Sequence, residues 1–289
     1  MRIEALNGKF GKVVRDIAVP TLDDANLREL LTNLYANRFL VLKTNGLSKA
    51  QYRDFACRIG EPIPLSRDSD FPEIAHISNL QTSTKESRLG AAHWHTDQSF
   101  RKTVSSVTML YSVHAPEIGG ETKFCDMAAA YDALPKSTRQ EIDELMVVHR
   151  HGISVSAPQG DHKPLPPPNW DPEYTAFHPL VRRHPETNQK TLYAVTGTAQ
   201  GIKGMSHSAA EDLLKSLSAH TLQSRFTTSY RHQVHDIVMW DNPTVMHSAT
   251  PIDQATDPTN TRLLWRISLR GSPPLFESQR QEQANAVNS

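Results

Sequence analysis

The sequence has few cysteines, no long apolar run and no excess of either charge. Only two of its 289 residues are cysteines, Cys57 and Cys125. We interpret both as buried free thiols of a reducing compartment, since two cysteines make no disulfide framework. No run approaches the length of a membrane span, and the opening MRIEALNGKF lacks the apolar stretch of a signal peptide. The 31 Lys and Arg balance the 31 Asp and Glu, so no overall field attracts nucleic acid or membranes. We expect a soluble cytoplasmic protein.

Internal repeats and low-complexity linkers are also missing, which predicts a single domain over residues 1–289. Two segments depart from the general pattern. The segment 156–174, SAPQGDHKPLPPPNWDPEY, is rich in proline and has no hydrophobic period. Such a segment is typical of a lid or binding loop, or of a disordered stretch. The polar tail, about 272–289, is expected to be flexible.

Apolar spacing predicts helices over 23–38, 48–60, 127–134, 137–146 and 206–217. Capping boxes are expected at Ser137–Gln140 and Ser208–Glu211. Short strands are expected over 39–43, 74–78, 93–100, 104–113, 122–127, 225–230, 234–240 and 262–269. Many short strands with peripheral helices favour a mainly-β fold, either a barrel or a two-sheet jelly roll buttressed by helices.

The stretch HWHTDQSF places His93, His95 and Asp97 on alternate positions. Side chains two apart in a strand point the same way, so His95 and Asp97 would converge. Two histidines and one carboxylate form the facial triad of non-heme Fe(II) enzymes, which leaves positions open for a co-substrate and dioxygen. The third ligand should come from a distant strand, and His247 is the best candidate. The alternative is a structural histidine at that position.

Fourteen histidines make chance matches expected. His184 and Glu186 in HPE repeat the spacing, but we place them in an exposed hairpin turn. His149 and His151 in HRH lack a nearby carboxylate, and we interpret them as strand residues that face solvent.

Arginines recur on one face of the last expected strand. In TRLLWRISLRG, Arg262, Leu264, Arg266 and Ser268 alternate with apolar residues. One interpretation makes this the wet face of the strand. The other makes the arginines an inward pair that binds carboxylates, which suits the planar guanidinium.

Several blocks together resemble the Fe(II)/2-oxoglutarate-dependent dioxygenases of the taurine dioxygenase and 2,4-dichlorophenoxyacetate dioxygenase family. These blocks are HWHTDQSF, EIGGETKFCDMAAAYDALP, HPLVRRHPETNQKTLYA, DIVMWDNPTVMHSA and RLLWR, in the family's order between about Phe39 and Leu269. The resemblance implies a double-stranded β-helix, or jelly roll, and an enzyme that uses Fe(II), 2-oxoglutarate and O2. It also implies that a small substrate is hydroxylated or oxidatively cleaved while succinate and CO2 are released.

The resemblance also implies residue roles. His95, Asp97 and His247 would bind iron, and Thr122 with Arg262 would bind the distal carboxylate of 2-oxoglutarate. Arg266 matches a position near the substrate's acidic group, which suggests an anionic substrate; the alternative is that it supports Arg262 or an acidic neighbour.

The substrate is predicted less well than the cofactors. Leu65 and Asp68 stand where the taurine enzymes carry a histidine and a tyrosine, which disfavours taurine as the substrate. The resemblance is closer to the aryloxyacetate branch, in which FCDM and AAYDALP also recur. Arg67 could replace the cationic residues of that branch. His93 and Asn79 are further candidates for substrate contact, and His93 could instead pack under the Pro-rich loop. The family often forms homodimers or homotetramers.

Two other functions use the same residues. A cupin-like metal hydrolase would need the His/Asp cluster but not Thr122 and Arg262. A non-catalytic relative of the fold would be free to lose a metal ligand.

Overall fold

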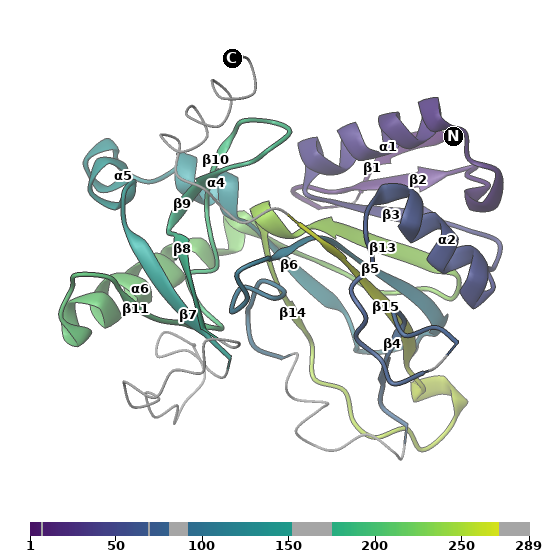
Figure 1. Ribbon diagram of the computed structural model, residues 1–289. Helices are drawn as coiled ribbons and strands as arrows, with labels where there is room; N and C mark the ends of the chain where they lie inside the picture. Colours follow the sequence, from purple (N-terminus) through teal and green to yellow (C-terminus); the bar gives the residue numbers. More distant parts are fainter. Residues whose placement is uncertain (7, 69, 81–91, 152–174, 272–289) are drawn as a thin grey trace.

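The computed structural model describes residues 1–6, 8–68, 70–80, 92–151 and 175–271. Both the Pro-rich segment and the tail lie outside the described residues. A seven-stranded sheet dominates the structure (Figure 1). Its strands, in spatial order, are β1 (Arg2–Ala5), β2 (Lys12–Arg15), β3 (Phe39–Lys43), β13 (Asp236–Asp241), β5 (Ser105–His114), β15 (Leu263–Arg270) and β4 (Ala75–Ser78).

The remaining strands of the described residues form three smaller sheets. One, facing the large sheet, contains β12 (Thr227–Tyr230), β6 (Thr122–Asp126) and β14 (Val245–Ala249). A second sheet contains β11 (Ala199–Ile202), β7 (Met146–Arg150) and β8 (Thr175–Pro179). The third pairs β10 (Lys190–Leu192) with β9 (Val181–Arg183). The structure also contains the short 3-10 helices η1 (Val19–Thr21), η2 (Ser224–Phe226), η3 (Asn242–Thr244) and η4 (Pro258–Asn260). This arrangement confirms the predicted jelly roll with peripheral helices.

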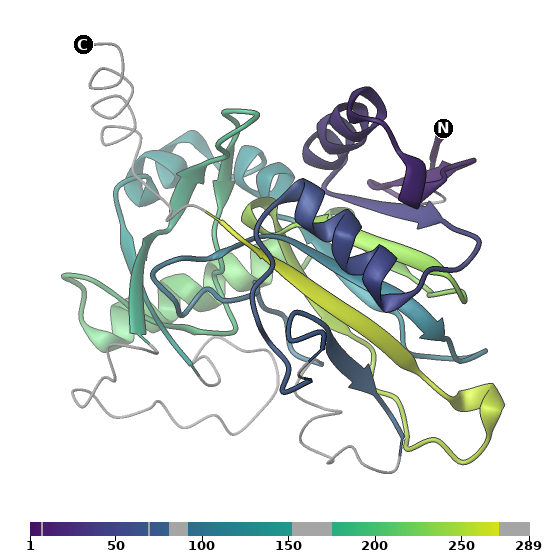
Figure 2. The same ribbon diagram turned by 45° about the vertical axis from the view of Figure 1, so that its right-hand side comes forward.

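Two helices cover the outer face of the large sheet, α1 (Asp24–Asn37) and α2 (Lys49–Ile59), as Figure 2 shows. Asp23 caps α1 by accepting a hydrogen bond from the Asn26 amide. Ser48 and Gln51 form a capping box on α2, which ends at Gly60 as the sequence predicts. The apolar stripes of both helices pack on alternate residues of the strands beneath them.

The opposite face of the large sheet looks inward. Its apolar residues pack against the sheet of β12, β6 and β14; they include Val41, Leu110, Val238, Trp240 and Leu264. Because residues two apart share a face of a strand, this inner face also carries the polar residues that line the site.

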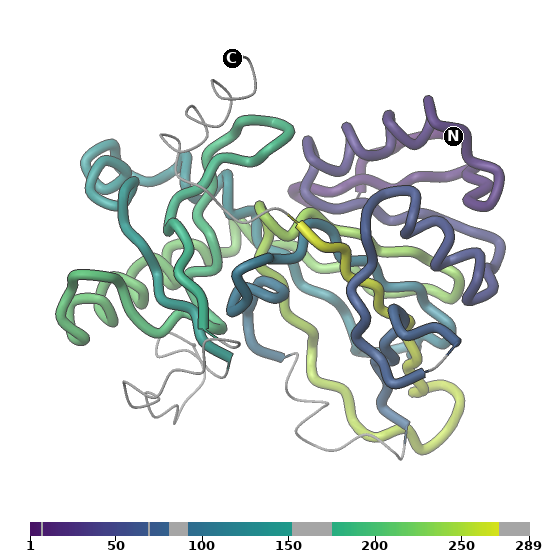
Figure 3. The backbone as a smooth tube through the Cα atoms, in the orientation of Figure 1, coloured from purple at the N-terminus to yellow at the C-terminus, as the bar shows by residue number. Residues whose placement is uncertain are grey.

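The middle of the chain forms a second region, beside the region that contains the N-terminal segments and the last strand, β15 (Figure 3). It contains α4 (Met127–Asp132), α5 (Lys136–Ile142) and α6 (His207–Thr221), packed on β7, β9, β10 and β11. Its apolar core is separate from that under α1 and α2.

Some local predictions were wrong. The residue before α5 is Pro135, with no side-chain cap, so the Ser137–Gln140 box does not form. Ser206, not Ser208, caps α6, because the helix begins at His207, two residues before the start that a cap at Ser208 would require. Cys125 is a buried free thiol, whereas Cys57 is free but exposed, since it lies on the outward side of α2.

Candidate active site

His95 and His247 face each other across a pair of backbone hydrogen bonds. The His95 amide donates to the His247 carbonyl over 3.0 Å, and the His247 amide donates to the His95 carbonyl over 2.8 Å. The two rings lie 4.2 Å apart between centroids. This reciprocal pair fixes two distant segments of the chain in one register.

The predicted strand over 93–100 was wrong, because this segment makes one isolated bridge and then turns from Asp97 onward. The side chains of His95 and Asp97 nevertheless converge with that of His247. Ligand atoms of His95, Asp97 and His247 all lie within 4.8 Å of one another. The three side chains that the sequence singles out could therefore hold one metal ion.

The hydrogen bonds of His95 fix which ring nitrogen is available. Its Nδ1 lies 2.9 Å from the His93 carbonyl oxygen, which can only accept, so Nδ1 carries the proton. The Nε2 lone pair then faces the cluster, 3.7 Å from Asp97 Oδ1. Nε2 of His247 lies 3.7 Å from Asp97 Oδ2. Burial and the neighbouring His95 lower the pKa of His247, which keeps its ring in the neutral form that binds metals.

Asp97 is buried yet held in its ionised form. Its Oδ2 accepts a 2.7 Å hydrogen bond from Thr108, and its Oδ1 pairs with Arg266 at 2.7 Å. Burial alone would raise the pKa of Asp97, but Arg266, the two histidines and Thr108 together lower it well below its ordinary 3.8. The carboxylate is therefore a permanent anion between two imidazoles.

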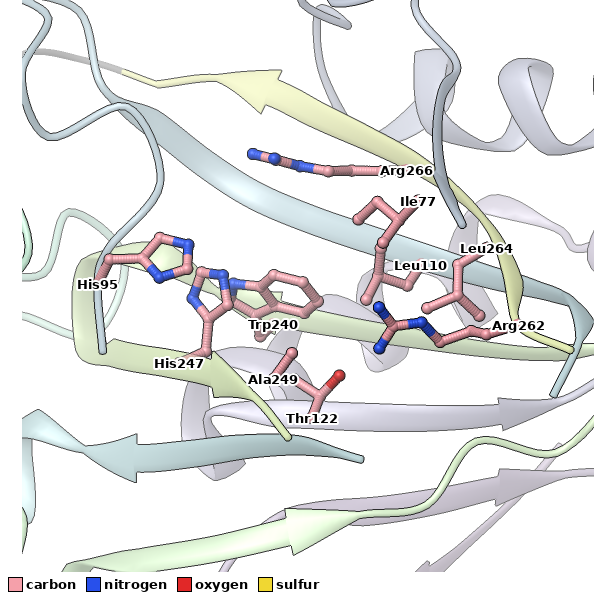
Figure 4. Close-up of a pocket in the computed structure, with 10 residues that line it drawn as sticks. All are labelled: Ile77, His95, Leu110, Thr122, Trp240, His247, Ala249, Arg262, Leu264 and Arg266. Atoms are coloured by element: carbon pink, nitrogen blue, oxygen red, sulfur yellow. The ribbon is translucent and has the colours of Figure 1, made fainter. Parts of the chain in front are cut away.

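A cavity extends from the histidines along the inner face of the large sheet (Figure 4). His95 and His247 lie at one end and Arg262 with Thr122 at the other, with Trp240 between them. The remaining wall is mostly apolar: Ile77, Leu110, Ala249 and Leu264. An elongated molecule with one metal-binding end and one anionic end matches this distribution.

Arg262 is a buried cation that no side chain of the described residues neutralises. Only 3% of its surface is exposed, and its Nε has no hydrogen-bond partner. Burial lowers the pKa of Arg262. An unpaired buried charge costs several kcal/mol, roughly, so such a site favours an anionic ligand. Gly120, with φ +69°, leaves room for this side chain, because a Cβ there would lie 3.3 Å from Arg262 Cδ.

The alternating arginines face inward, so the wet-face interpretation was wrong. Leu264 and Arg266 line the cavity beside Arg262, while Ile267 and Leu269 on the opposite face lie under the helices. Arg266 remains partly exposed, with 24% of its side chain accessible.

The other substrate candidates lie in different environments. His93 is half-buried, its ring 5.3 Å from that of His95. Asn79 is fully buried; its amide donates to the carbonyls of Asp253 and Asn260, and its oxygen accepts from the Arg262 amide. Arg67 is exposed between α2 and β4 and is not among the described residues that line the cavity.

The competing histidines have other roles. His184 is buried, contrary to its predicted exposure, and both ring nitrogens are used: Nε2 at 3.2 Å from Asp241 and Nδ1 by the amides of Glu186 and Thr187. The turn that follows is exposed, as predicted. His149 is also buried, because its strand packs on both faces, and its Nδ1 lies 2.9 Å from Thr198 Oγ1. His151 is exposed.

Sequence reasoning missed the residues that contact the candidate ligands. Asn242 donates to Thr108 over 2.8 Å and accepts from the Trp240 indole over 3.0 Å, and this chain of hydrogen bonds ends on Asp97. Gly197 (φ +78°) lies against His95, where an added Cβ would come within 2.9 Å of the His95 Cβ. Only the glycine in the turn signal TGT hinted at a close approach, and nothing in the spacing pointed to Asn242.

Comparisons with known proteins agree with this geometry. The family described as "Taurine catabolism dioxygenase TauD, TfdA family" matches residues 2–268. An alpha-ketoglutarate-dependent 2,4-dichlorophenoxyacetate dioxygenase of Cupriavidus pinatubonensis is 31% identical over 86% of this chain and 91% of its own.

Solved structures show the same fold. A taurine dioxygenase from Burkholderia xenovorans superposes with a TM-score of 0.78 at 26% identity, over 96% of this chain and 93% of its own. AAD-2, solved with Mn(II) and N-oxalylglycine, gives 0.77 at 26% identity over 94% and 99%. The chain therefore belongs to the TauD/TfdA family and is a dioxygenase that depends on Fe(II) and 2-oxoglutarate (alpha-ketoglutarate).

Proposed function

We propose that His95, Asp97 and His247 bind the iron, and that Arg262 and Thr122 bind the distal carboxylate of 2-oxoglutarate. The buried guanidinium of Arg262 at the far end of the cavity, which no side chain of the described residues neutralises, carries this assignment. When bound, iron and 2-oxoglutarate supply the oxygen-activating chemistry, with succinate and CO2 as products. The chain's own residues bind and orient the cofactors and the substrate, and they exclude water from the site.

The test is anaerobic titration of the Fe(II)-loaded protein with 2-oxoglutarate, followed by the visible charge-transfer band of the chelated keto acid. The band should appear in the wild type and be lost in His247→Ala. Arg262→Gln should bind 2-oxoglutarate at least 10-fold more weakly, since a charge-assisted hydrogen bond contributes about 1.5–3 kcal/mol. Unchanged affinity in Arg262→Gln would remove Arg262 from the carboxylate site.

We further propose an anionic organic substrate, bound near Arg266. Arg266 is the cavity-lining cation that keeps partial exposure, and it lies beside the metal ligands. The related Cupriavidus enzyme is named for an aryloxyacetate, which is an acid. Hydroxylation at the carbon next to an ether oxygen would give an unstable product, so cleavage is the expected outcome for such a substrate.

The ion pair between Arg266 and Asp97 supports a second role for this arginine, which is to orient the ligand carboxylate. Arg266→Ala separates the two roles. A higher KM for 2,4-dichlorophenoxyacetate or other acids at saturating metal supports substrate binding. A change confined to iron affinity would show that Arg266 orients Asp97 and does not bind the substrate.

His93, Asn79 and Arg67 stay predicted substrate residues of lower rank. We favour His93 among them, because it lies beside His95, whereas all three hydrogen bonds of the Asn79 amide go to backbone.

The compartment and assembly are also proposals. Two free thiols agree with a reducing cytoplasmic setting. No helix in the described part of the chain is long and apolar enough to cross a membrane. Light scattering after gel filtration tests the homodimer or homotetramer that the family resemblance suggests.

A further inference from the structure

A buried histidine lies directly behind Thr122. His232 precedes β13 and is 3% exposed. Its Nε2 lies 2.8 Å from Thr122 Oγ1, and its Nδ1 lies 3.1 Å from Ser112 Oγ. The three side chains form a continuous chain from β5 to the cavity wall.

His232 is neutral at physiological pH. Burial, together with the charge of Arg262, lowers the pKa of His232 to about 3. A neutral imidazole has one N–H donor and one lone pair. One of the two hydroxyls, of Thr122 or Ser112, must therefore accept a hydrogen bond from the ring, and the other must donate one to it. The direction of the whole chain of hydrogen bonds therefore depends on which nitrogen carries the proton.

The two tautomers have different consequences for Thr122. With the proton on Nδ1, the imidazole donates to Ser112, and the Thr122 hydroxyl donates its only hydrogen to Nε2. That arrangement also leaves the Ser112 hydroxyl hydrogen, fully buried, with no acceptor among the described contacts. With the proton on Nε2, Ser112 donates to Nδ1, Nε2–H donates to Thr122, and the Thr122 hydrogen is free to point into the cavity.

We propose that His232 is a positioning residue, held by Ser112 as the Nε2–H tautomer, which turns the Thr122 hydroxyl into a donor aimed at the distal carboxylate of 2-oxoglutarate. This inference rests on the proposed role of Thr122 and Arg262. The two sides of the carboxylate site then contribute differently. Arg262 supplies the positive charge, whereas the hydrogen-bonded series Ser112–His232–Thr122 supplies an oriented neutral donor. The two together select a keto acid with a second carboxylate.

The experiment compares two keto acids under anaerobic conditions. The Fe(II)-loaded protein is titrated with 2-oxoglutarate and with 2-oxopentanoate, which lacks the distal carboxylate, and the charge-transfer band gives each Kd. Thr122→Val and His232→Leu should each weaken 2-oxoglutarate binding about 10-fold or more and leave 2-oxopentanoate within twofold. His232→Gln should recover part of the loss, because its amide N–H can reach the place of Nε2–H.

The double variant Thr122→Val/His232→Leu should bind 2-oxoglutarate no more weakly than Thr122→Val alone, since His232 acts through Thr122. Additive losses, or equal weakening of both keto acids by His232→Leu, would overturn the proposal. A wild-type protein that shows no band would instead reject the proposed 2-oxoglutarate site, so the two failures are distinguishable.

Nitrogen NMR gives a readout independent of binding strength. In the Zn(II)-substituted protein with 2-oxoglutarate, the His232 imidazole, assigned by its loss in His232→Gln, should carry its proton on Nε2. A proton on Nδ1 in the wild-type complex would contradict the proposal.

Discussion

At the scale of single residues, the site depends on keeping one buried carboxylate ionised and in place. Asp97 is oriented by Thr108 on one oxygen and Arg266 on the other. Thr108 is itself fixed by Asn242 and lies 3.0 Å from Ser268 Oγ. Residues that orient metal ligands by hydrogen bonds contribute measurably to metal affinity.

Thr108→Val should therefore weaken Fe(II) binding about 10- to 100-fold, because Asp97 loses a hydrogen bond while the core volume is kept. Competition with a fluorescent chelator measures the change. Thr250→Val is the matched control, since Thr250 bonds to Glu121 outside the cluster. Equal losses in both variants would show that the effect is not specific to Asp97.

Buried neutral histidines make stability depend on pH. Burial lowers the pKa of His178 to about 4, from an ordinary 6.5. The unfolded chain then binds a proton that the folded chain refuses, so stability is full above pH 6.5 and is lost as pH falls toward 4. In His178→Gln the free energy of unfolding, measured in urea on the metal-free protein, should fall less steeply near pH 5, by roughly 1 kcal/mol per pH unit. The exposed His207→Gln is the control, and a slope unchanged in both variants would contradict the assignment.

At the scale of elements, the strands that carry the site were predictable where one face is apolar. The alternation in β15 placed both arginines on one face, and the structure shows that face lining the cavity. The segment 93–100 was not predictable in this way. Its conformation comes from a bridge to His247, about 150 residues away in the sequence, and from the turn after Asp97. The candidate ligands were recognisable although the strand predicted over 93–100 was wrong.

The turn before β11 is an element on which His95 depends. Gly197→Ala should weaken Fe(II) binding, because its Cβ would press on the His95 backbone at 3.1 Å and on the Trp94 carbonyl at 3.0 Å. Gly204→Ala is a matched control, since Gly204 has a similar φ of +82° and open space around it. Metal affinity lost in the first variant and kept in the second separates the steric effect from backbone strain. Equal affinities would show that the turn moves without disturbing His95.

At the scale of the whole molecule, the cavity joins segments that are far apart in the sequence. His95, Thr122, His247 and Arg262 come from four separate segments around the two facing sheets. Local patterns reveal each segment but not their meeting, because non-local pairing is decided by packing over the complete chain. His232 shows the same limit: it stands in an unremarkable loop sequence, and only the fold brings it to Thr122.

Because no single segment holds the metal and the keto acid, both should bind the folded chain and not the unfolded one. Ligands of this kind raise stability by about 2.7 kcal/mol at a concentration of 100 Kd, which corresponds to roughly 5 °C in Tm for a chain of this size. We expect Mn(II), chosen because it resists oxidation, to raise Tm, and 2-oxoglutarate to raise it further only when Mn(II) is present. His247→Ala should show neither shift, since it removes one of the three proposed ligands. Stabilisation by 2-oxoglutarate without metal, of the same size in wild type and His247→Ala, would mean that the keto acid binds through Arg262 alone and that the two ends of the cavity act independently.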